Sequence, residues 1–321
     1  MNVHLTFDVE IWCNDWAHLD ERFPSAFERY VFGRSAQGAF ALPKTLELLD
    51  RHGLHGVFFV EPLFAARFGL EHLATIVDLI RDAGQEVQLH LHTEWVDELP
   101  YAIVEDCRRK RQHLSYFTLE EQIALISHGA QLLEQAGANR PTTFRAGSFA
   151  CNHDSYKAMN VCGLTIDSSL NACTKVSGPD LRALDIHQRP AWLEGVYSVP
   201  VAIYSDGFGK LRSAQVNGSG FRELIEAMEG GAEAGVTDFV IVSHNFEMLK
   251  PGTSVPDAVV VRRFERLCAH LQAQRSVLPT TTFTVPEAQV AEARPGPEDG
   301  LCTAGVMATT TRHLEQLWRR F

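Results

Sequence analysis

The sequence predicts an α/β fold built on a parallel sheet, with closure into a (β/α) barrel favoured over an open sheet. Short, continuous apolar runs alternate along the chain with longer segments in which apolar residues recur at helical spacing. Strands that are apolar along their whole length are typical of a parallel sheet that helices cover on both faces. Six or seven such strand–helix units favour a barrel.

The first predicted strand is the run VHLTF over residues 3–7, which ends at Asp8. Segment 11–40 is aromatic and irregular, contains Pro24, and predicts a long loop. The next helix begins near Pro43 and ends at Gly53, because proline favours helix starts and glycine favours helix ends. Further strands are predicted at 56–60, 86–92, around Phe144, around Ile166, at 196–204, 238–244 and near Phe283, and further helices at 70–83, 118–136, 154–162, 220–234 and 257–274.

The composition changes after Pro286. Residues 287–308 are rich in alanine, glycine and proline, and residues 309–321 have the pattern of a terminal helix. We therefore predict one barrel domain over residues 1–286 and a C-terminal tail over residues 287–321.

Composition and charge exclude several classes of protein. The net charge of −11 argues against a nucleic-acid partner, which needs a clustered basic surface. No run approaches the roughly 20 apolar residues of a transmembrane helix. The start MNVHLTFDVE lacks the pattern of a signal peptide, and the seven cysteines form no CxxC pair. We expect a cytoplasmic protein.

Titratable residues end several of the predicted strands. In parallel α/β folds the carboxyl ends of the strands form the active site, so these side chains are predicted to share one rim. They are Asp8, Glu10, His90, His92, Arg145, Asp167 and His244.

The second of these segments, LHLHTEW, has the features of a metal site. His90 and His92 share one face of a strand because side chains alternate, and Glu94 follows closely. Imidazole and carboxylate groups suit Zn²⁺ and related divalent metals. Trp12 and Trp95 each follow an acidic motif, and each either stacks on a sugar ring or forms a wall of the pocket.

Five motifs in order, TFDVE, HLHTE, FRAGSF, IDSS and VIVSH, resemble those of the polysaccharide deacetylase family, also called NodB-homology or carbohydrate esterase family 4. The similarity covers about residues 3–285. The DVE form and the loop after it look most like the subgroup linked to lipopolysaccharide O-antigen synthesis. The resemblance implies a distorted (β/α)7, TIM-like barrel that uses a divalent metal to remove an acetyl group from an N- or O-acetylated sugar.

The resemblance also implies roles for individual residues. Asp8 matches the catalytic base, Arg145 the arginine that orients this base, and His244 the catalytic acid. Asp167 matches the aspartate of the fourth motif, and His90 matches the first metal histidine. Substrate-binding positions are predicted at Trp12, Trp95 and Ser148. The implied substrate is a nucleotide- or lipid-linked acetylated sugar precursor.

Two positions depart from the family pattern. Val9 stands where the family has a metal-binding aspartate, and Glu94 stands where it has the second metal histidine. The metal set is therefore Asp8 or Glu10 with two of the three side chains His90, His92 and Glu94. The metal is Zn²⁺ or another divalent ion such as Co²⁺, Mn²⁺ or Ni²⁺.

Three other functions stay open at the level of sequence. A glycoside hydrolase on a related barrel needs two carboxylates about 5–9.5 Å apart, and Asp8 or Glu10 with Asp167 are available. A metal-independent amidohydrolase on the same scaffold is the second alternative. The third is a non-catalytic, sugar-binding relative.

Overall fold

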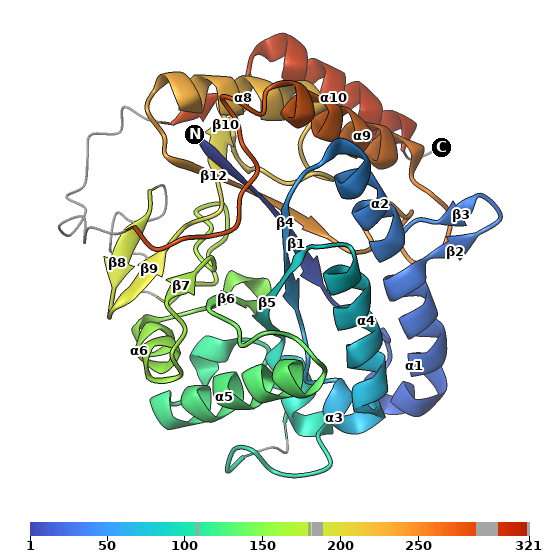
Figure 1. Ribbon diagram of the computed structural model, residues 1–321, viewed down its shortest axis with the longest axis vertical. Helices are drawn as coiled ribbons and strands as arrows, with labels where there is room; N and C mark the ends of the chain where they lie inside the picture. Colours follow the sequence, from blue (N-terminus) through green and yellow to red (C-terminus); the bar gives the residue numbers. More distant parts are fainter. Residues whose placement is uncertain (107–108, 179–180, 182–188, 287–300, 320–321) are drawn as a thin grey trace. The chain divides into compact units, whose positions relative to one another are not determined.

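The computed structural model describes residues 1–106, 109–178, 181, 189–286 and 301–319 (Figure 1). The chain forms two compact units. The first comprises the described residues of Met1–Gly56, Ala202–Thr282 and Glu298–Phe321, and the second those of Val57–Val201 and Phe283–Pro297.

The centre of the first unit is a parallel pair of strands, β1 (Asn2–Val9) and β12 (Asp238–His244). Every residue of β1 from Val3 onward is buried, as expected for a strand that is covered on both faces. The register aligns Asp8 with His244, so the last polar side chains of both strands lie next to each other.

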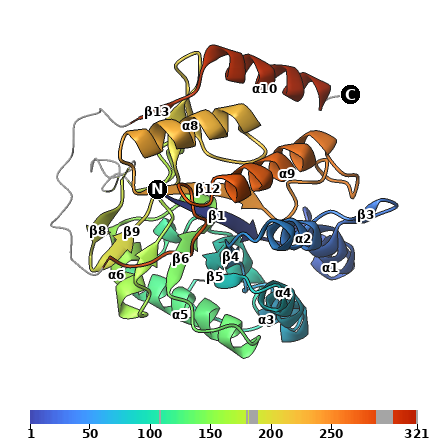
Figure 2. The same ribbon diagram turned by 45° about the horizontal axis from the view of Figure 1, so that its top comes forward.

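Helices and short strands surround this pair. Helix α8 contacts both α9 and α10, and α2 contacts α9. Figure 2 shows α10 as the outermost of these helices, beyond α8. The other elements are η1 (Trp16–His18), α1 (Leu19–Phe27), η2 (Glu28–Phe32), β2 (Arg34–Ser35), β3 (Gly38–Ala39), α2 (Leu42–His52), β10 (Ile203–Ser205), β11 (Leu211–Ser213), α8 (Phe221–Glu233), α9 (Ala258–Ala273), β13 (Cys302–Thr303) and α10 (Val306–Trp318).

The second unit contains a sheet with the strand order β4-β5-β6-β7-β9-β8, parallel except for the β9–β8 hairpin. Helices α4, α5 and α6 pack side by side next to it (Figure 1). The elements are β4 (Gly56–Val60), α3 (Ala65–Phe68), α4 (Leu70–Asp82), β5 (Glu86–Leu91), η3 (Thr93–Glu98), η4 (Leu114–Tyr116), α5 (Leu119–Gln135), β6 (Thr143–Ala146), η5 (Gly147–Phe149), α6 (His153–Val161), β7 (Ile166–Asp167), β8 (Ala191–Leu193) and β9 (Val196–Ser198).

Most predicted helices and strands are confirmed, and the residues that begin and end the helices are of the expected types. Helix α2 has Pro43 in its first turn and ends at Gly53, whose φ of 60° favours glycine. Helix α5 begins with a capping box, in which Thr118 and Glu121 satisfy each other's backbone N–H groups. The prediction of one domain over 1–286 and a tail over 287–321 stays a prediction, and residues 287–300 lie outside the described residues.

The prediction of a loop over residues 11–40 is wrong, because this segment contains helix α1. Pro24 lies inside that helix, which is why the sequence suggested a break. The signal that was missed is the spacing of the buried residues Leu19, Phe23 and Phe27, which repeat every four positions.

Two predicted strands also differ from the structure. The run 196–204 is divided into β9 and β10, with Pro200 between them. Near Phe283 no strand forms, and the backbone pairing there is an isolated bridge between Val3 and Thr280. The threonines and valine of this segment favour a strand, but a strand forms only where a neighbouring strand is available for pairing.

Within the described part of the chain, no helix combines the length and the apolar character needed to span a bilayer. The six described cysteines form no disulfide with one another.

Candidate active site

Two carboxylates lie at the carboxyl end of β1. Asp8 and Glu10 point to the same side, as the alternation predicts, and only 2% and 6% of their surfaces are exposed. Asn245, just after β12, holds this end in place, because its side chain binds both the N–H and the C=O of Glu10 at 3.2 Å. Carboxylates this buried need a cation or a proton nearby.

His244 is one source of that positive charge. Ligand atoms of Asp8, Glu10 and His244 all lie within 4.8 Å of one another. The His244 Nε2 atom is 3.9 Å from Glu10 Oε1, and its Nδ1 donates to Glu247 Oε1 at 2.8 Å. The structure thus brings three of the predicted site residues together inside the first unit.

Glu247 is a residue of this cluster that the sequence analysis missed. Its carboxylate is almost fully buried and also accepts hydrogen bonds from Ser243 Oγ and Gln215 Nε2, at 3.0 Å and 2.7 Å. Ser243 and Gln215 hold the Glu247 carboxylate in place, and this carboxylate in turn holds the His244 imidazole ring. The signal for Glu247 is its place three residues after His244, in the turn that follows β12.

The electrostatics of this cluster favour a charged imidazole. Burial alone lowers the pKa of His244, but the hydrogen bond to Glu247 and the charges of Glu10, Glu247 and Asp8 outweigh it and raise the pKa to about 9. His244 is therefore an imidazolium at neutral pH and can donate a proton from Nε2.

The predicted metal residues of the second unit also cluster. The His90 and His92 rings lie edge to face with their centroids 4.8 Å apart, and His92 Nδ1 is 3.2 Å from Glu94 Oε2. His90 Nδ1 donates to the backbone C=O of Arg145 at 2.8 Å, so Nε2 is the nitrogen that carries the lone pair. A backbone acceptor behind a histidine is the usual arrangement for a metal ligand.

Gly147 of the FRAG segment is required by this cluster. A Cβ atom at Gly147 would lie 2.6 Å from the C=O of Leu91 and 2.9 Å from His92 Nδ1. Ser148 follows with a φ of 55°, and Phe149 with 60°, which are strained values for residues other than glycine. Such strain is often concentrated at functional sites, and the substrate contact of Ser148 stays a prediction.

Glu61 is a second residue that the sequence analysis missed. It follows β4 directly, is only 1% exposed, and its Oε1 accepts the Leu63 N–H at 2.9 Å. Its Oε2 is buried and has no hydrogen-bond partner among the described residues. Burial raises the pKa of Glu61 to about 8, against the opposing effects of the Leu63 N–H and of His92.

We expect Glu61→Gln to remove a dependence of stability on pH. Because the folded state raises this pKa above 4.5, the native protein should lose about 1.4 kcal/mol of stability per pH unit between roughly pH 5 and 8. Urea unfolding across this range, in the presence of a chelator, measures the slope. The variant should be flatter, whereas the exposed control Glu134→Gln should keep the native slope; equal slopes in all three proteins would contradict the assignment.

Arg145 and Asp167 are both buried, in the second unit. Arg145 binds the C=O and the hydroxyl of Ser168 at 3.0 Å and 3.1 Å, and its guanidinium lies 4.2 Å from the centroid of the Phe59 ring. Asp167 accepts hydrogen bonds from the hydroxyls of Tyr156, Ser169 and Ser198. Burial raises the pKa of Asp167, and these hydroxyls oppose the increase.

The two predicted tryptophans have different surroundings. Trp95 is 1% exposed and packs edge-on against Phe64 and Phe68, which favours the role of a wall over that of a stacking platform. Trp12 is half-buried, and its indole N–H donates to Glu10 Oε2 at 2.6 Å. Trp12 therefore holds a carboxylate of the candidate site.

Comparison with known proteins identifies the fold. No family model and no curated protein matches the sequence. Among solved structures, an assigned polysaccharide deacetylase from Mycobacterium smegmatis is 19% identical, with a TM-score of 0.51 over 89% of this chain and 94% of that one. The family 4 carbohydrate esterase from Streptomyces lividans is 15% identical, with a TM-score of 0.42 over 95% of this chain and 97% of that one.

A 4-alpha-glucanotransferase from Thermococcus litoralis is also similar, with 10% identity and a TM-score of 0.50 over 88% of this chain and 37% of that one. Identities this low define a fold and leave the chemistry to the site. The predicted fold class is thus confirmed: the chain has an α/β fold of the polysaccharide deacetylase-like (β/α)7 type.

Proposed function

We propose that the protein is a metal-dependent deacetylase that hydrolyses an N- or O-acetyl group of a sugar. The observation that carries this proposal is the cluster of Asp8, Glu10 and His244 at the ends of two adjacent parallel strands, with Glu247 behind the imidazole. Amide hydrolysis requires a base for the attacking water and an acid for the leaving amine, and this cluster contains one of each.

The side chains present fit a divalent metal. The proposed ligands are Glu10, His90, His92 and Glu94, and the hydrogen bond that places the His90 proton on Nδ1 supports a ligand role for Nε2. When bound, Zn²⁺, Co²⁺, Mn²⁺ or Ni²⁺ would polarise the acetyl carbonyl and lower the pKa of water toward about 7.

The protein's own groups then handle the protons. Asp8 accepts a proton from the attacking water, whose oxygen bonds to the acetyl carbon. His244 Nε2 donates its proton to the leaving nitrogen as the carbon–nitrogen bond breaks, since an amine anion is a very poor leaving group. Glu247 keeps the Nδ1 proton and holds the ring in place. The roles of Arg145 and Asp167 rest on the resemblance of their motifs.

The finer parts of the proposal come from the resemblance as well. They are a role in lipopolysaccharide O-antigen synthesis, a nucleotide- or lipid-linked sugar precursor as the substrate, and a cytoplasmic location.

Metal content and acetate release test the proposed function together. The purified protein should hold about one equivalent of divalent metal, and should release acetate from acetylated nucleotide sugars or acetylated oligosaccharides. Glu10→Ala and His90→Ala should lose both properties, while the surface control Glu134→Ala keeps them. Release of reducing sugar without acetate would favour the glycoside hydrolase, and acetate release that survives a chelator would favour a metal-independent amidohydrolase.

Glu247→Gln should weaken the acid and leave substrate binding unchanged. Glutamine retains the shape of the side chain but loses the charge, so the pKa of His244 should fall from about 9. An acid acts only while protonated, so the decline of kcat at high pH should begin at a lower pH, with KM unchanged. Glu233→Gln, on the exposed end of α8, is the matched control. An unchanged pH profile would contradict the role of Glu247.

A further inference from the structure

Helix α10 exposes its large apolar side chains and buries an arginine and a threonine. The buried face consists of Ala308, Thr309 and Arg312. On the outer face, Trp318 is 79% exposed and Leu314 is 56% exposed. Met307, Val306 and Leu317 are exposed as well. This is the reverse of the pattern of a helix that packs on a core.

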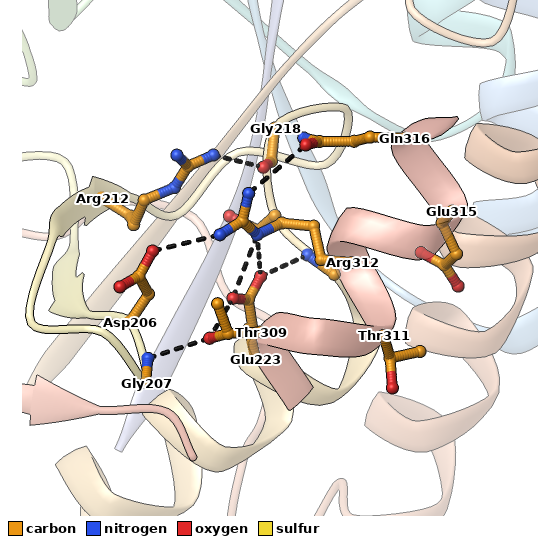
Figure 3. A network of polar contacts seen from close by, with 12 residues as sticks. Asp206, Gly207, Arg212, Gly218, Glu223, Thr309, Thr311, Arg312, Glu315 and Gln316 are labelled. Carbon is orange, nitrogen blue, oxygen red and sulfur yellow. Dashed lines mark hydrogen bonds and ion pairs between the residues drawn. The ribbon is translucent and has the colours of Figure 1, made fainter. Parts of the chain in front are cut away.

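Polar contacts, not apolar packing, hold α10 in place. Figure 3 shows the Arg312 guanidinium between two carboxylates, with Nη2 3.0 Å from Asp206 and Nε 2.8 Å from Glu223. Thr309 Oγ1 donates to Glu223 at 2.7 Å and accepts the Gly207 N–H at 2.9 Å. These contacts engage the inner face, and the large apolar side chains of the outer face remain exposed. Contiguous exposed apolar side chains of this kind mark interaction sites.

A groove of about 430 Å³ lies between α9 and α10, and positive charge borders it. Arg262 and Arg266 of α9 line it together with Leu314 and Trp318 of α10. Both arginines are exposed, and neither has a carboxylate partner among the residues that the structure describes. The Arg266 guanidinium lies over the Phe221 ring, 4.1 Å from its centroid.

The carboxylates of this region are already paired. Glu315 lines the same groove, and its Oε2 accepts from Arg263 Nε at 2.7 Å. Asp257, which caps α9, pairs with Arg319 at 2.7 Å. The groove therefore has an excess of positive charge on a chain whose net charge is −11.

We propose that the outer face of α10 and the arginines of this groove bind the surface of an anionic phospholipid bilayer. A helix that lies along a membrane inserts one apolar face at the level of the headgroups, and tryptophan favours that depth. Arginines at the edge of such a helix bind the lipid phosphates. Leu314, Leu317 and Trp318 supply the first feature, and Arg262 and Arg266 supply the second.

Charge disfavours a second copy of the chain as the occupant. In a two-fold symmetric contact the same patch meets itself, so one positively charged groove would lie against another. Nothing in the groove would neutralise them, because Glu315 is engaged with Arg263. An anionic bilayer supplies both the negative charge and the apolar phase. This inference does not depend on the proposed deacetylase activity.

Co-sedimentation with lipid vesicles tests the proposal. The full chain should bind vesicles of phosphatidylglycerol and phosphatidylcholine, and should bind phosphatidylcholine vesicles far more weakly. Arg262→Gln with Arg266→Gln should weaken binding by roughly 25-fold, because each arginine near an anionic surface contributes about a factor of 5. Leu314→Gln with Trp318→Gln should abolish binding. These side chains are exposed, so folding should survive, as thermal melting will verify.

Two controls make the test specific. Phe208→Gln changes a side chain that is similarly exposed on the β10–β11 turn, and should bind vesicles like the native protein. Trp318→Phe keeps an apolar ring and should still bind vesicles. In the native protein, brominated phospholipids should quench the fluorescence of Trp318, and this part of the quenching should be missing in the variant. Absence of binding, equal binding to neutral vesicles, or unchanged binding by both double variants would overturn the proposal. So would a concentration-dependent dimer that Trp318→Gln disrupts.

Discussion

Replacing His244 with asparagine is expected to lower kcat for acetate release by roughly 10²–10⁴-fold. His244 is the imidazolium of the candidate site, with a pKa near 9 and Glu247 as its fixed partner. Asparagine retains a polar side chain of similar reach but carries no proton that it can give to the leaving amine. KM should change little, because the lost interaction acts mainly in the transition state.

The control for His244→Asn is His313→Asn, which changes an exposed histidine of α10. Steady-state kinetics on an acetylated sugar and a thermal melt of each variant separate catalysis from folding. A large loss of kcat with a native melting temperature would support the acid role. A variant with native kcat would exclude His244 as the proton donor and return attention to the carboxylates Asp8 and Glu10.

Replacing Arg312 with alanine is expected to destabilise the protein by about 3–5 kcal/mol, because it leaves two buried carboxylates without their cation. Asp206 and Glu223 both lose their ion pair with the guanidinium (Figure 3). Burial opposes ionisation of Asp206, yet the N–H groups of Lys210 and Phe208 and the charge of Arg312 lower its pKa.

Chemical denaturation measures the effect of Arg312→Ala, with Arg319→Ala as the matched control. Arg319 also pairs with a carboxylate of the same unit, but its side chain is more exposed, so its loss should cost less. Arg312→Ala combined with Glu223→Gln should recover part of the stability, since one of the unpaired charges is removed. Equal costs for the two single arginine variants would show that the buried network does not determine the position of α10.

Local sequence patterns predicted the strand–helix order and most of the site residues. Strands β1 and β12 are buried and mostly apolar, so the polar residues Asp8 and His244 at their ends could be recognised in the sequence. Helix α1 was missed, because Pro24 obscured a helical spacing that burial later revealed.

The partners of the site residues were much harder to predict. Glu247 lies in the turn after β12, and the sequence does not show which residue of that turn contacts His244. Glu61 follows β4 directly, but only the structure shows that its Oε2 is buried with no hydrogen-bond partner among the described residues. Trp12 and Trp95 look alike in the sequence, yet one donates to Glu10 and the other fills a core.

The α/β order, the polar strand ends and the family resemblance of the motifs can all be recognised in the sequence, because each depends on residues close together in the chain. The raised pKa of His244, the partners of Glu247 and the orientation of α10 become visible only in the folded structure. These depend on contacts between distant residues, such as Arg312 with Asp206, 106 positions apart. Burial and ion pairing at that separation arise only when the chain has folded, since they are properties of the packed interior.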